Sequence, residues 1–157
     1  KGVASECSIQ NIKVLLDSGD SVGDMLSKGL KQILNQVQTT TAIDIANLSL
    51  GVTYPEYSEI IPIIEELSKS TILVAAAGEN EKLLISNEPL YPAFSSKVIS
   101  VGAIDNAFLK THPNSIFHHR VDYLMPYNNL ISCSTLKIIY TKNLRAVAWL
   151  LLLFRVS

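Results

Sequence analysis

The 157-residue chain has little of what several classes of protein require. It has only two cysteines, Cys7 and Cys133, which fit no metal-ligand spacing and are free, paired or incidental. Lysine and arginine number 13 and aspartate and glutamate 14, so the net charge is −1 and no basic stripe is present. This charge balance argues against nucleic-acid binding.

No apolar run is long enough to cross a membrane. The longest one covers residues 146–154, whereas a spanning helix needs about 20 residues. The chain begins with Lys1 and not with Met, and no signal peptide is recognisable there, so we expect an excerpt of a longer protein. The compartment does not follow from the sequence.

The composition, 48% hydrophobic and 17% charged, is that of a globular domain with a real core. Apolar residues that recur at intervals of three and four predict a helix over residues 21–37, with Ser21 as its cap and Asp24 three positions later. A second helix is expected over residues 57–68. Apolar runs predict strands at residues 9–16, 42–50, 71–76 and 97–104. Alternating strands and helices indicate a parallel sheet with right-handed crossovers.

Small residues follow two of these strands, and Asn80 lies just beyond one of them. We call the residues that follow each of these two strands its exit. In parallel sheets the carboxyl ends of the strands lie at one edge, where ligands bind, so both exits are expected together at this edge, the rim. Small residues let a substrate backbone lie close, and an amide can donate a hydrogen bond to an oxyanion. Small residues there are equally explained by tight packing of strand ends. The exits consist of Ser49, Leu50 and Gly51, and of Ala76, Ala77 and Gly78.

Six short segments occur in a fixed order along the chain. They read KGVA at 1–4, KVL at 13–15, IANLSLG at 45–51, ILVAAAG at 72–78, YPA at 91–93 and VISVGAID at 98–105. Together they resemble the subtilisin-like serine proteases (subtilases), which carry GVAP, KVL, VINMSLG, VVAAAGN, YPA and VI(S/T)VGA(V/T)D. The resemblance covers residues 1–105 well and continues faintly through 121–126 to Ser132. It implies an α/β fold, a parallel sheet with helices on both faces, incomplete in this chain.

The resemblance also implies a polypeptide substrate in the parent protein. Ser49, Leu50 and Gly51, with Ala76, Ala77 and Gly78, would form the two walls of the primary specificity pocket. The oxyanion Asn of the family directly follows the Gly of its AAAGN turn. Here Glu79 takes that place, and its carboxylate would repel the developing charge. Asn80 is therefore the candidate donor, unless it is only a turn residue.

The catalytic triad of this family has the chain order Asp, His, Ser. Its Asp and His precede the GVAP segment, at which this chain begins, so neither is present. His112, His118 and His119 follow the VGAID segment and are expected in a polar surface loop, and the pair at 118–119 lacks a third metal ligand. We expect no cofactor and no metal site. Structural calcium occurs in the family without being assignable here, and many relatives are secreted or belong to the cell envelope.

The sequence changes character near residue 135, which divides the chain into a partial subtilase-like catalytic domain, residues 1–135, and an anomalous tail, residues 136–157. Read in frame, the tail predicts a short buried helix or a hydrophobic end. Read in a shifted frame, eleven codons from the junction of Arg145 and Ala146 onward permit Gly-Ser-Ser-Met-Ala-Thr-Pro-Leu-Val-Ser-Gly. This resembles the serine motif of the family. We therefore expect that the tail is out of frame beyond about Thr135, with a genuine divergent tail as the alternative.

The expected function is thus that of a fragment of a serine endopeptidase that is inactive in the form given. Two other classes remain. One is a non-catalytic, subtilase-derived module that binds an extended peptide at Gly51 and Gly78. The other is an unrelated doubly wound domain that binds a nucleotide, although no strand is followed by a Gly-x-Gly-x-x-Gly motif or a P-loop.

Overall fold

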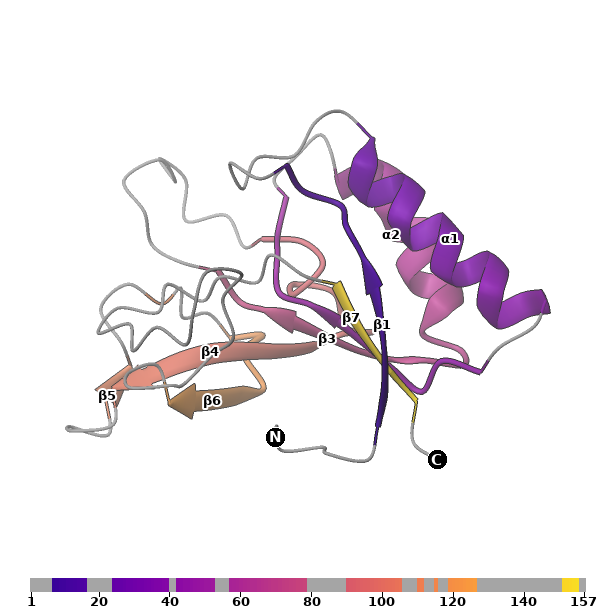
Figure 1. Cartoon of the computed structure of the whole chain (residues 1–157). Coiled ribbons are helices and arrows are strands. Elements are labelled where there is room, and N and C mark those ends of the chain that lie inside the picture. The colour runs from indigo at the N-terminus through magenta and orange to yellow at the C-terminus, as the bar shows by residue number, and fades with distance from the viewer. Residues whose placement is uncertain are drawn as a thin grey trace.

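The computed structural model describes residues 7–16, 24–39, 42–52, 57–78, 90–105, 110–111, 115, 119–126 and 151–155. In these residues the structure has seven strands, which form one mixed sheet, and two helices that cover it (Figure 1). The elements are β1 (Ser8–Ile12), α1 (Met25–Thr39), β2 (Ile45–Leu48), α2 (Tyr57–Leu67), β3 (Ile72–Ala76), β4 (Ile99–Asp105), β5 (Lys110–Thr111), β6 (Tyr123–Pro126) and β7 (Leu151–Arg155).

Both helices and strands β1 to β4 confirm the elements that the periodicity of the sequence predicts, although several of them begin or end at other residues than expected. β1 stops at Ile12 and β2 covers only Ile45–Leu48, so both are shorter than expected. Helix α1 begins at Met25, and its first backbone hydrogen bond runs from Lys28 N to the carbonyl of Asp24. The predicted cap Ser21 lies outside the described residues.

The sheet has the order β1-β7-β2-β3-β4-β5, and β6 also pairs with β4. Strands β2, β3 and β4 pair in parallel, as predicted, with Leu48 opposite Ala75 and Ala76 opposite Val101. β6, which the sequence did not predict, also pairs in parallel with β4. Two strands run the other way: β5 on β4, and β7 between β1 and β2. The helix expected as one reading of the tail is wrong for residues 151–155, because this apolar run pairs on both sides as a strand.

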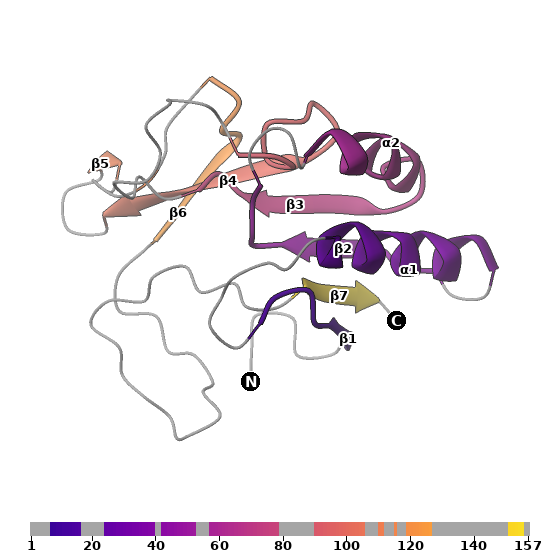
Figure 2. The ribbon, with the colours of Figure 1, turned by 90° about the horizontal axis from the view of Figure 1, so that it is seen from above.

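Both described helices cover the same face of the sheet and contact each other (Figure 2). Right-handed crossovers between successive strands in one direction place their helices on one side. Strand alternation shows which side chains face them: Leu73 and Ala75 are buried, while Ile72 is 53% exposed on the opposite face. The core includes Leu30, Ile33, Ala46, Leu48, Ile64, Leu67 and Leu73.

Within the described residues, neither helix has the length and apolarity needed to span a membrane.

Candidate functional site

The two glycine-containing exits leave neighbouring strands at the same end of the sheet. β2 and β3 are parallel and in direct register, so residues 49–51 and 76–78 both continue from carboxyl ends that lie side by side. The structure therefore brings together the six residues expected at the rim. The carboxyl ends of adjacent parallel strands are the place where such sheets hold their ligands.

The exit of β2 is held by local hydrogen bonds. Leu50 N donates to the carbonyl of Leu48 at 2.7 Å, which turns the chain sharply around Ser49. The Asn47 side-chain amide donates to Ser49 Oγ at 2.9 Å, and Ser49 Oγ lies 3.2 Å from Asn47 Oδ1. The Ser49 hydroxyl thus orients the turn, and nothing among these contacts activates it as a nucleophile.

Gly51 lies where another segment passes close to the rim. A Cβ at this position would be 2.7 Å from Leu90 Cβ, a distance that normal side chains do not adopt, and 3.0 Å from Leu90 Cδ1, which is unusually tight. The neighbouring Val52 and Tyr91 exchange two backbone hydrogen bonds, of 2.8 Å and 3.0 Å. Residues 90–91 thus form a further side of the rim. Sequence reasoning missed this contact because it joins segments about 40 residues apart.

The exit of β3 continues the sheet for one residue and then turns. Ala77 is fully buried, and its N–H donates to the carbonyl of Val101 at 2.9 Å. Gly78 has a φ of 110°, a conformation that residues with a side chain rarely adopt. The requirement for glycine here is therefore conformational. Glu79 and the candidate oxyanion donor Asn80 lie outside the described residues, so the role of Asn80 stays a prediction.

Of the three histidines, only His119 belongs to the described residues. It is exposed, and its ring packs edge-on against Phe94 with centroids 5.7 Å apart and planes at 83°. The next residue, Arg120, donates from Nη2 to the carbonyl of Ser95 at 3.2 Å. These contacts attach the turn before β6 to the segment before β4. Across the described ranges, no three His, Cys, Asp or Glu side chains gather as metal ligands.

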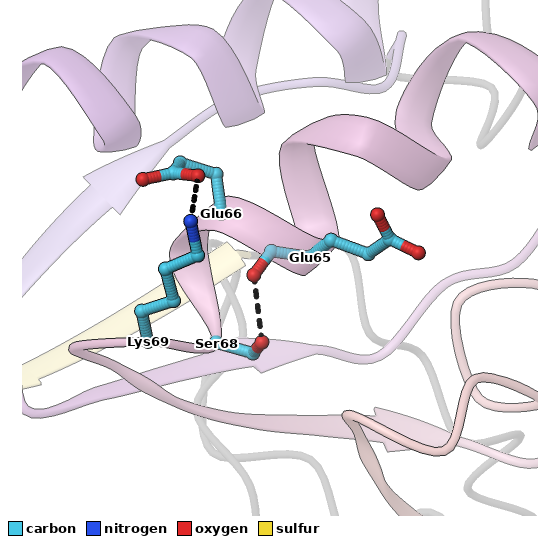
Figure 3. Close-up of polar contacts among 4 residues, drawn as sticks. All are labelled: Glu65, Glu66, Ser68 and Lys69. Atoms are coloured by element: carbon cyan, nitrogen blue, oxygen red, sulfur yellow. Dashed lines mark hydrogen bonds and ion pairs between the residues drawn. The ribbon is translucent and has the colours of Figure 1, made fainter.

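A pocket at the amino ends of β3 and β4 is separate from the rim. Its lining includes Lys69, Thr71 and Lys97. Beside it, the turn after α2 is closed by a hydrogen bond of 2.9 Å from Ser68 Oγ to the carbonyl of Glu65, and by an ion pair of 2.5 Å between Lys69 and Glu66 (Figure 3). Lys69 is thus paired with a carboxylate of α2, which explains its place in structural terms.

Comparison with known proteins gives one consistent result. A model of the subtilase family matches residues 1–146. Subtilisin DY from Bacillus licheniformis is 30% identical over 105 residues, which are 67% of this chain and 36% of that protein. Sphericase superimposes with a TM-score of 0.62, and a cold-adapted subtilisin-like serine proteinase with 0.57, each at 22% identity and over 76% of this chain.

The chain spans only part of each relative. It covers 36% of Subtilisin DY, 43% of sphericase and 41% of the cold-adapted proteinase. The structural matches establish a subtilisin-like fold, and the incomplete α/β sheet predicted from the sequence is confirmed.

Proposed function

Since this chain belongs to the subtilase family, we propose that it is the central part of the catalytic domain of a serine endopeptidase. It carries the substrate-binding rim and lacks the catalytic triad. The observation that carries this proposal is the rim itself: two adjacent parallel strands whose exits end in Gly51 and Gly78, in a chain matched by the family over residues 1–146.

In the parent enzyme the rim would hold an extended polypeptide. Gly51 is exposed and would let a substrate backbone approach the protein main chain on the side that Leu90 does not fill, while the small, partly exposed Ala76 would leave room for a substrate side chain. A triad serine from outside this part of the sequence would attack the peptide carbonyl, with a histidine as proton carrier. A backbone N–H and the Asn80 amide would stabilise the oxyanion.

The chain by itself would have no peptidase activity, because a rim without a nucleophile and base binds a substrate but does not cleave it. The test is hydrolysis of a generic peptide substrate together with labelling by a fluorophosphonate, next to an active subtilisin as positive control. Cleavage or labelling above the buffer level would overturn the proposal of inactivity, and absence of both would support it.

We further propose that residues beyond about Thr135 are translated out of frame, and that the parent gene encodes the serine motif there. The direction of β7, which runs against both of its neighbours, supports this proposal. The family match reaches residue 146 and so includes residues 136–146 in the frame given, which counts against a change of frame as early as Thr135. Sequencing the source DNA from upstream of Lys1 to beyond Ser157 tests the proposal. A stop codon or a missing motif in the shifted frame would contradict it.

The same DNA sequence distinguishes a fragment of an endopeptidase from a non-catalytic peptide-binding module. An Asp and a His upstream with the serine motif downstream would support the endopeptidase. An intact frame without a triad would instead support a non-catalytic module that binds an extended peptide at the rim.

A further inference from the structure

One face of the sheet carries apolar side chains on several strands. Residues that lie opposite each other in a ladder point to the same face, and neighbours along one strand point to opposite faces. The register links β1 to β3 through β7 and β2, and it links β3 to β6 through β4. One alternating set of side chains therefore shares a face, which we call the outer face. It includes Ile9, Ile72, Ile99, Val101, Tyr123 and Met125.

Four of these side chains are more than half exposed to solvent. The exposed fraction is 59% for Ile9, 53% for Ile72, 62% for Tyr123 and 57% for Met125. The two described helices cover the other face, where Leu73 is buried (Figures 1 and 2). Contiguous apolar surface that remains exposed marks a site at which another protein element packs.

A helix suits the outer face better than a strand does. The backbones of β3 and β4 are already paired on both sides, with β2, with each other and with β5 and β6, so these two strands offer no unpaired edge for an added strand. What they expose is side chains, and parallel strands are normally covered by helices on both faces. The expected occupant is therefore an amphipathic helix whose apolar stripe lies on the outer face.

The relatives indicate where such a helix comes from. The chain covers 36% of Subtilisin DY, 43% of sphericase and 41% of the cold-adapted proteinase, so more than half of each relative lies outside the match. In a second copy of this chain, the described helices already cover its own sheet. The part of a subtilase domain outside this chain is thus the better source of the covering helix.

A hollow at one end of the outer face adds a charge to this description. The pocket at the amino ends of β3 and β4 has a volume of about 390 Å³, and its lining includes Ile72 and Ile99 of the outer face together with Lys69 and Lys97. Lys69 is paired with Glu66, whereas Lys97 is exposed and has no ion-pair partner among the described residues. A partner that covers the face is therefore expected to place an apolar side chain in the hollow and an acidic group beside Lys97.

We propose that the outer face is the interface for the part of a subtilase domain that lies outside this chain. The partner binds through an amphipathic helix, with its apolar stripe on β3, β4 and β6 and an acidic group beside Lys97. This inference rests on the fold and on family membership, and it is independent of the proposed peptidase activity.

Protection of a single cysteine from a maleimide tests the interface, in the intact chain with Cys7→Ser and Cys133→Ser. Ile72→Cys reports on the outer face, and Glu65→Cys, at an exposed position on α2, is the matched control. The probe is the two parts of Subtilisin DY outside its 105 matched residues, supplied as separate polypeptides. At about ten times the Kd, the labelling rate of Ile72→Cys is expected to fall about tenfold, because only the free chain reacts. The rate of Glu65→Cys should not change.

A chimera removes the dependence on association. In it, the matched residues of this chain replace their counterparts in Subtilisin DY, so the remaining parts are joined covalently. Protection of Ile72→Cys in either form supports the proposal, and labelling as fast as in the chain alone in both forms overturns it. Protection that grows with the concentration of the chain alone would identify a second copy as the occupant and also overturn it. A chimera that is protected but cleaves no peptide would contradict the proposed endopeptidase and leave the interface in place.

The acidic group is tested by charge reversal. Lys97→Glu is expected to weaken binding of the separate polypeptides several-fold, whereas Lys31→Glu, at an exposed position on α1, should leave it unchanged. Equal effects of the two variants would overturn the placement of an acidic group beside Lys97.

Discussion

Ser100 and Asp122 exchange two hydrogen bonds across the start of two strands. Ser100 N donates to Asp122 Oδ2 at 2.8 Å, and Asp122 N donates to the carbonyl of Ser100 at 2.9 Å. The next residues, Val101 and Tyr123, are the first pair of the parallel ladder between β4 and β6. The contact thus sets the register in which β6 joins the sheet.

Removal of the Asp122 carboxylate is expected to destabilise the protein by about 1–3 kcal/mol, because the N–H of the fully buried Ser100 would lose its acceptor. The change is Asp122→Ala, measured as the free energy of unfolding in denaturant. Asp122→Asn keeps an acceptor oxygen of the same shape and serves as the control, with a smaller loss expected. Equal losses in both variants would show that the hydrogen bond is not what stabilises this junction.

Gly29→Ala is expected to lower stability, although alanine is favoured over glycine in helices by about 1 kcal/mol. The added Cβ collides with Val14 Cγ1, and overpacking of this kind costs about 1–3 kcal/mol. Val14→Ala removes the colliding atom, so the double variant should lose less than the sum of the single variants. The exposed position Gln32 on the same helix gives the control Gln32→Ala, for which little change is expected. Stabilisation by Gly29→Ala would contradict the close contact.

Gly51→Ala is expected to disturb the rim, because its Cβ would press on Leu90. A loss of about 1–3 kcal/mol is expected in the unfolding free energy. Leu90→Gly removes the Cβ at 2.7 Å, so a double-mutant cycle should reveal coupling between the two sites. Strict additivity of the two changes would mean that Leu90 does not limit the space at Gly51.

The carboxyl of Asp24, before α1, has a pKa below its ordinary value of 3.8, first because the Lys28 side chain donates a hydrogen bond to it and then because of the charge of Lys28. A depressed pKa means that the charged form stabilises the folded state. This stabilisation is complete above the ordinary pKa and is lost as the pH falls through the folded pKa.

Titration of Asp24 by NMR checks this. Lys28→Met is expected to move the pKa back toward 3.8, whereas Lys31→Met, which removes only a weak charge interaction, should change it less. An unchanged pKa in Lys28→Met would exclude the ion pair as the cause.

The sequence by itself determined the helices and the central strands. The prediction of a helix over 57–68 matches Tyr57–Leu67, and that of a strand over 71–76 matches Ile72–Ala76. Both succeed because burial on one face imposes a period that is visible locally. The rim at Gly51 and Gly78 also followed from the sequence, since the carboxyl ends of neighbouring parallel strands must lie together.

Only the tertiary structure decided which distant segments meet. The apolar run of β7 is compatible with a helix or a strand, and the open position between β1 and β2 selected the strand. The contact of Leu90 with Gly51 and the pairing of Asp122 with Ser100 have no local signature, because each depends on where a remote backbone passes. Periodicity reports which face of an element is buried, whereas the choice of partner depends on the space and the unpaired backbone groups that the rest of the fold leaves.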